Sequence, residues 1–142
     1  MHLGKDGKIE LIKRVPLFSK LSKKGLEEVA HIADELDLPE GKVMATEGDR
    51  GREFFVLLEG EADVTKGDKS INTMHEGDFF GEIALVDGGR RTATVTTTVP
   101  SRAFVLGPRQ FQNVLHQNVE VIHSVMRALA TRVREAGAAK AD

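Results

Sequence analysis

The sequence predicts a mainly β domain with helices at both ends, and three observations support this fold class. The chain has 142 residues, the size of one ordinary domain with a single core. From residue 42 to residue 105, short runs of β-branched or aromatic residues alternate with glycine turns, a pattern typical of a small sandwich or barrel. On either side of this region, apolar residues recur at helical spacing.

The N-terminal segment is expected to be helical over about residues 6–37. A first amphipathic stretch stops near Val15, because Pro16 disfavours helical geometry at the residue before it. Ser22 is a candidate N-cap for a second helix. The apolar face of that helix would consist of Leu26, Val29, Ala30, Ala33 and Leu36.

The β region is expected over about residues 38–106. Its strand candidates are residues 43–46, 53–58, 62–65, 70–74, 92–99 and 102–106. Between them, Gly60, Gly67 and Gly77 provide turn chemistry.

Two C-terminal helices are expected over about residues 108–136. Pro108 suits the first turn of the first helix, which contains Phe111. Asn118 is a candidate cap for the last helix, and Gly137 would end it. The apolar stripe of the last helix would consist of Val121, Ile122, Val125, Met126, Leu129, Ala130 and Val133.

The composition argues against several classes of protein. Hydrophobic residues make up 40% and charged residues 30%, with a net charge of −2, which indicates a soluble globular protein. This charge gives no reason to expect a nucleic-acid partner within the chain, and no apolar run approaches the length of a membrane span. The chain contains no cysteine, which excludes disulfides and thiolate metal sites and fits a cytoplasmic location.

Nothing in the sequence supports an enzyme. A β-roll metal enzyme would need clustered ligands, but no His-x-His or His-Glu-x-x-His spacing is present. A nucleophile elbow of the Gly-x-Ser-x-Gly type is also missing. We therefore expect neither catalysis nor a metal site. The scattered histidines are His2, His31, His75, His116 and His123.

The candidate binding site is the stretch Phe-Gly-Glu-Ile-Ala-Leu-Val at residues 80–86, followed after a short gap by Arg-Thr-Ala-Thr-Val at residues 91–95. Exposed backbone N–H groups in a short helical turn form an anion site. An arginine offers a planar fork that can hold two phosphate oxygens. Since a carboxylate repels phosphate, Glu82 should face a hydroxyl group such as that of a ribose. The stretch therefore predicts a pocket for a sugar phosphate.

This stretch closely resembles the phosphate-binding cassette of cyclic-nucleotide-binding domains, the family that includes the sensor domain of catabolite activator protein and the protein kinase A regulatory subunit. The resemblance covers nearly all the chain, from about Val15 to Arg134. It implies one domain over residues 1–142, with the cassette at residues 80–93. The implied fold is an antiparallel β-roll or jelly roll (double-stranded β-helix) with N-terminal helices and two C-terminal helices.

The resemblance also implies a role for each cassette residue. Arg91 would form a bidentate pair with the cyclic phosphate, and Glu82 would accept a hydrogen bond from the ribose 2′-hydroxyl. Gly81 would let the backbone approach the ligand closely. Further backbone N–H groups would come from Ile83, Ala84 and Ala93.

Neighbouring residues bear on the base and on the hinge. Phe80 and Met74 would lie near the sugar or base, with core packing as the favoured alternative. Leu85 would touch the hinge before the last helix. Thr92 resembles the family hydroxyl residue that contacts a guanine amino group, which favours cGMP slightly. Because family members with threonine there also bind cAMP, we expect cAMP as the ligand, with cGMP as a close second.

Some positions depart from the family pattern or leave alternatives open. Arg90 stands where many cassettes carry proline, and would either attract phosphate or, as we favour, point to solvent. Arg132 would either pair with Glu82, as a helix arginine does in the resembling activators, or complement the helix dipole. No aromatic residue follows Phe111, so a partner chain or an aliphatic side chain such as Val133 would cover the base.

The implied function is a cyclic-nucleotide sensor in which the ligand draws the cassette inward and the last helix closes over the base. The few residues after Arg134 are too few for a DNA-binding domain, so the chain is expected to be either a stand-alone sensor or a fragment of a larger protein. We favour a stand-alone sensor that acts through an effector that the sequence does not name. The last helix could also support a homodimer. The alternative is a degenerate scaffold that mediates protein–protein interaction only, which a lost cassette arginine or glutamate would favour, and neither is lost here.

Overall fold

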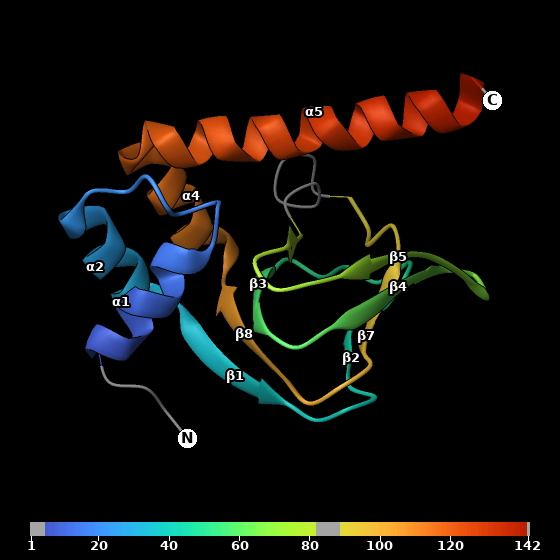
Figure 1. Ribbon diagram of the computed structural model, residues 1–142, viewed down its shortest axis with the longest axis horizontal. Helices are drawn as coiled ribbons and strands as arrows, with labels where there is room; N and C mark the ends of the chain where they lie inside the picture. Colours follow the sequence, from blue (N-terminus) through green and yellow to red (C-terminus); the bar gives the residue numbers. More distant parts are fainter. Residues whose placement is uncertain (1–4, 82–88, 142) are drawn as a thin grey trace.

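The computed structural model describes residues 5–81 and 89–141. Two antiparallel sheets form the β-roll, with strand orders β1-β8-β3-β6 and β2-β7-β4-β5. Helices α1, α2 and α4 lie at one side of this roll, and α5 runs along its upper edge (Figure 1). The mainly β fold with flanking helices is therefore confirmed. The elements are α1 (Lys5–Arg14), α2 (Lys23–Ile32), β1 (Asp34–Leu38), β2 (Val43–Ala45), β3 (Phe54–Glu59), β4 (Ala62–Lys66), β5 (Lys69–Met74), β6 (Phe79–Phe80), β7 (Thr94–Thr97), β8 (Ser101–Leu106), α4 (Pro108–Gln117) and α5 (Val119–Ala141).

The N-terminal helices begin as expected but end earlier. Ser22 caps α2, because its hydroxyl oxygen accepts a hydrogen bond of 3.1 Å from the backbone N–H of Gly25. The chain leaves the helix at Ala33, which has an extended conformation with φ −80° and ψ 131°. Leu36 was expected on the helical face, but it pairs with Ala103 in β1 and is 38% exposed. Leu36 continues the helical spacing by coincidence, because the chain is already extended at Ala33 and residues 34–38 pair with β8.

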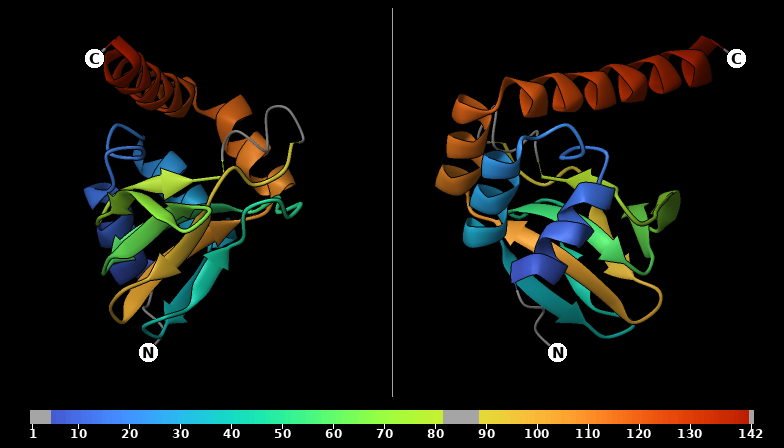
Figure 2. Two further views of the ribbon diagram at one scale, coloured as in Figure 1. Left: turned by 90° about the vertical axis from the view of Figure 1, so that its right-hand side faces the viewer. Right: turned by 60° about the vertical axis from the view of Figure 1, so that its left-hand side comes forward.

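Asn118 lies between the two C-terminal helices and contacts both. Its side-chain amide donates to the carbonyl of Val114 at 3.0 Å at the end of α4, and its backbone carbonyl accepts a hydrogen bond of 3.0 Å from the N–H of Val121 in α5. Helix α5 continues through Gly137 to Ala141, so the predicted end at Gly137 is wrong. A glycine inside a helix costs only about 1 kcal/mol relative to alanine, and the alanine-rich sequence around it favours the helix. Figure 2 shows the full length of α5 above the roll.

The described residues form two hydrophobic cores. The larger core joins the helices to the outer face of the β1-β8-β3-β6 sheet, and Phe54 stacks there on Phe111 with ring centroids 4.0 Å apart. The smaller core lies between the strands of the roll and consists of Ala45, Leu57, Ala62, Met74 and Val95. Strand β3 contributes to both cores, because successive side chains of a strand point to opposite faces.

Candidate functional site

The cassette is described at its two flanks. On one side lies β6 with the following Gly81, and on the other side lie residues 89–93, which lead into β7. Glu82, Ile83, Ala84 and Leu85 lie outside the described residues, so their predicted roles stay predictions.

Arg91 occupies the centre of the described site. Its backbone N–H donates to the carbonyl of Asp49 at 2.8 Å, and its carbonyl accepts from the N–H of Gly48 at 2.9 Å. These two bonds join the end of the cassette to the loop between β2 and β3. The residue is only 8% exposed, although arginine is rarely buried without specific partners.

Two aromatic rings flank the guanidinium of Arg91. Phe55 and Phe80 stack on each other with centroids 4.7 Å apart. The central carbon of the guanidinium lies 5.9 Å from the Phe55 ring and 5.7 Å from the Phe80 ring, within cation–π range. Phe80 thus lies beside the predicted phosphate partner while its ring also packs on the smaller core.

Two glycines allow the backbone to enclose the same guanidinium. A β-carbon at Gly51 would overlap the side chain of Arg91. A β-carbon at Gly81 would lie 2.9 Å from Nη1 of Arg91 and would also overlap the carbonyl oxygen of Glu53. Gly81 has a φ of +105°, a conformation that residues with a side chain rarely adopt. The backbone of Gly81 therefore lies close to the side chain of Arg91.

Sequence reasoning did not identify Glu53 as a partner of Arg91. Nη2 of Arg91 donates to the carbonyl oxygen of Glu53 at 2.9 Å, and it also lies 3.5 Å from Oε2 of the Glu53 carboxylate. The Glu53 side chain is 54% exposed, whereas that of Arg91 is 6% exposed. Both residues line a pocket of about 230 Å³ with the Val43–Ala45 strand β2 and the loop at Asp49 and Arg50.

The other predicted site residues lie at varying depths. Met74 is 5% exposed within the smaller core, in line with the core-packing alternative. Thr92 is exposed and Ala93 is half-buried at the entrance to β7. Arg90 is exposed, and its Nη1 donates to the carbonyl of Gly48 at 2.8 Å. The side chain of Arg132 lies outside the described part of α5.

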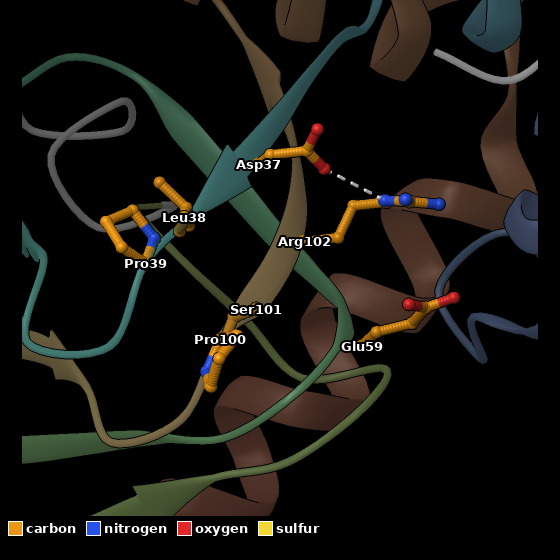
Figure 3. Close-up of a pocket in the computed structure, with 7 residues that line it drawn as sticks. All are labelled: Asp37, Leu38, Pro39, Glu59, Pro100, Ser101 and Arg102. Atoms are coloured by element: carbon orange, nitrogen blue, oxygen red, sulfur yellow. Dashed lines mark hydrogen bonds and ion pairs between the residues drawn. The ribbon is translucent and has the colours of Figure 1, made fainter. Parts of the chain in front are cut away.

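Another pocket, of about 440 Å³, contains none of the predicted site residues (Figure 3). Arg102 on β8 lies at this pocket, where its Nε is 3.2 Å from Oδ1 of Asp37 and 3.5 Å from Oε1 of Glu35. Both carboxylates belong to β1. Because these charges pair across neighbouring strands, the cluster holds β1 on the sheet.

The described residues offer no metal centre: no group of three or more His, Cys, Asp or Glu side chains among them is arranged to hold an ion. Among the described helices, none combines the length and apolar character that crossing a membrane requires.

Comparison with known families gives a direct match. The family model described as "Cyclic nucleotide-binding domain" matches residues 35–118. The cAMP-dependent protein kinase regulatory subunit of Mycosarcoma maydis is 37% identical over 113 residues, which cover 71% of this chain and 21% of that protein. A cyclic nucleotide-gated potassium channel of Rhizobium etli is 29% identical over 123 residues, covering 87% of this chain and 34% of the channel. The chain thus spans roughly a fifth to a third of the length of these relatives.

Solved structures share the fold. The structure "Sp-2Cl-cAMPS bound to PKAR CBD2" superposes with a TM-score of 0.69 at 26% identity, covering 90% of this chain and 95% of that one. The catabolite activator protein of Thermus thermophilus superposes with a TM-score of 0.78 at 23% identity, covering 86% of this chain and 60% of that one. These likenesses bear out the β-roll with flanking helices.

Proposed function

Because the chain belongs to the cyclic nucleotide-binding domain family, we propose that it is a sensor that binds cAMP, with cGMP as the second candidate ligand. The observation that carries this proposal is Arg91, a buried guanidinium enclosed by two glycines and flanked by two rings at the end of the cassette. An arginine held in one place loses little side-chain freedom when it binds a phosphate.

In the proposed complex, Arg91 binds the cyclic phosphate and Glu82 accepts a hydrogen bond from the ribose 2′-hydroxyl. Hydrogen bonds to charged groups contribute roughly 1.5–3 kcal/mol each, so the phosphate contact dominates affinity. Gly81, Ile83, Ala84 and Ala93 present backbone to the ligand. The similar domain PKAR CBD2 is bound to Sp-2Cl-cAMPS, which supports cAMP as the ligand class.

Thr92 is the proposed base-selecting residue. Thr92 directly follows the buried Arg91 and is itself exposed, which supports a contact between its hydroxyl and the base. The ratio of the cAMP and cGMP affinities therefore reports what Thr92 contributes.

The proposed response is a change in the position of α5. Val121 and Val125 of this helix are buried in the larger core. Further along, a pocket of about 430 Å³ separates α5 from the roll, with Arg127 and Thr131 on the helix side and Met74 on the roll side. This space lets α5 move toward the roll when the ligand binds. Equal amide-exchange protection of α5 with and without saturating cAMP would exclude this response.

We propose that the sensor contacts other proteins through an exposed apolar stripe on α5. Val119, Met126 and Val133 are seven residues apart and 59%, 60% and 70% exposed. Half-buried Ile122 and Leu129 lie between them, which completes a heptad pattern typical of a coiled coil. We propose that this stripe pairs with a second copy of the chain and that the dimer acts on an effector protein in the cytoplasm.

Two experiments test the function. In the first, the purified chain is stripped of bound nucleotide and titrated calorimetrically with cAMP and with cGMP. Micromolar or tighter binding to either supports a sensor. Binding to neither, by a folded chain, would leave the alternative of a degenerate scaffold that contacts only proteins. In the second, sedimentation of the wild-type chain and of Met126→Glu measures the dimer, which the charge in the stripe should disrupt.

A further inference from the structure

We infer that Glu53 is a built-in competitor for Arg91: its carboxylate pairs with the guanidinium and must yield to the cyclic phosphate. The inference rests on the proposed function, since it concerns the affinity of the same site. It adds a residue outside the cassette that sets how tightly the ligand binds.

The chemistry of the guanidinium makes the competition direct. Arginine offers two bidentate forks, one formed by Nε–H with Nη2–H and the other by Nη1–H with Nη2–H. Either fork therefore needs a hydrogen on Nη2. In this structure one Nη2 hydrogen goes to the Glu53 carbonyl at 2.9 Å, and the Glu53 carboxylate lies 3.5 Å from the same nitrogen. A bidentate phosphate and the carboxylate thus compete for the second hydrogen.

Burial determines which partner moves. The Arg91 side chain is 6% exposed, and the backbones of Gly51 and Gly81 enclose it. The Glu53 side chain is 54% exposed, so it can rotate into solvent at little cost. Arg50 lines the same pocket and offers the displaced carboxylate a second cation. The phosphate therefore displaces Glu53 while Arg91 stays in place.

The contacts favour competition over a positioning role for the carboxylate. The backbone carbonyl of Glu53 accepts a hydrogen bond of 2.9 Å from Nη2, and a substitution of the Glu53 side chain leaves that carbonyl in place. The carboxylate adds a longer ion pair in a half-exposed setting, which stabilises the free protein only weakly. Removing its charge therefore leaves Arg91 oriented and removes a negative charge from beside the phosphate.

The test compares wild-type protein with Glu53→Gln and with Glu59→Gln as a matched control. Glu59 is the exposed last residue of β3, whereas Glu53 immediately precedes that strand, so both variants lose one exposed carboxylate at an end of the same strand. Each protein is titrated calorimetrically with cAMP at low and at high salt, and the melting temperature of each ligand-free protein is recorded.

We expect Glu53→Gln to bind cAMP about three- to tenfold more tightly at low salt, and less so at high salt, because salt screens half-exposed charges. Glu59→Gln should bind like wild type, and the ligand-free Glu53→Gln protein should melt at or slightly below the wild-type temperature. If the wild-type protein binds cAMP and folded Glu53→Gln binds it equally or more weakly, the inference about Glu53 is wrong while the proposed function stands. Absence of cAMP binding by both proteins would instead overturn the proposed function, and the inference with it.

Discussion

The two hydrophobic cores differ in what they contribute. The larger core contains Phe18, Phe54, Phe104 and Phe111, each at most 2% exposed. The smaller core, beside the candidate site, contains two alanines and, among the described residues, no fully buried aromatic ring. Burial of aromatic side chains supplies much of a domain's stability. The comparison indicates that the helical side supplies most of the stability of the molecule, whereas on the roll side hydrogen bonds, glycines and the ring pair of Phe55 and Phe80 shape the candidate site.

Strand β3 connects these two regions. Phe54, Val56 and Leu58 point into the larger core, while Leu57 points into the smaller one. Phe55 lies beside Arg91. One strand therefore joins the stable side of the molecule to the site, and substitutions on its two faces should have separable effects.

The largest expected effect tests the larger core. Phe104→Ala removes a side chain that is 0% exposed and should lower the free energy of unfolding by about 3–5 kcal/mol. Denaturant unfolding measures this loss. Met74→Ala in the smaller core is the comparison, and we expect a loss of about 2 kcal/mol, at the low end for such a change. A larger loss for Met74→Ala would reverse the assignment of stability to the helical side.

The next effect concerns binding. Arg91→Ala should weaken cAMP binding by about 2–5 kcal/mol, which is roughly thirtyfold or more, because the phosphate loses its buried partner. Calorimetric titration measures the change. Arg90→Ala is the matched control, since Arg90 is exposed and its guanidinium donates to a loop carbonyl. Unchanged affinity of a folded Arg91→Ala protein would disprove the assigned role.

Gly81→Ala should disturb stability and binding together. The residue has a φ of +105°, and a β-carbon there would overlap the Glu53 carbonyl, so we expect a loss of about 1–3 kcal/mol in stability. Gly67→Ala is the control: its φ is +63°, but a β-carbon there meets nothing within 4 Å. Thermal unfolding and cAMP titration of both variants separate two effects: backbone strain, which both share, and the close contact of Gly81 with Glu53 and Arg91. Equal effects on binding would mean that the approach at Gly81 does not matter.

The smallest effect lies on the helical side. Ser22→Ala removes the cap of α2 and should lower stability by about 1 kcal/mol without changing cAMP affinity. Ser19→Ala, which removes an exposed hydroxyl bonded to the carbonyl of Pro16, should change stability less. A change in affinity for Ser22→Ala would show that the two regions are coupled more tightly than the cores suggest.

Local patterns predicted most elements, and the exceptions have physical causes. The spacing around Val29 and the cap at Ser22 predicted α2 correctly. The β1 strand was missed because Leu36 fits helical spacing, and β6 was missed because a two-residue strand carries no period to detect. The motif predicts Arg91 as the phosphate partner, and that role stays a prediction. Its partner Glu53 lies 38 residues away along the chain, and only the folded structure brings the two residues into contact.

Helix α5 has a further consequence as a mechanical element. Side chains as far as Leu129 pack against the larger core, and the helix continues to Ala141, roughly 18 Å further at 1.5 Å per residue. Over that length, a rotation of about 10° at the packed end displaces the far end by about 3 Å. If α5 moves as proposed, its length makes the displacement at the far end larger than the displacement at the packed end.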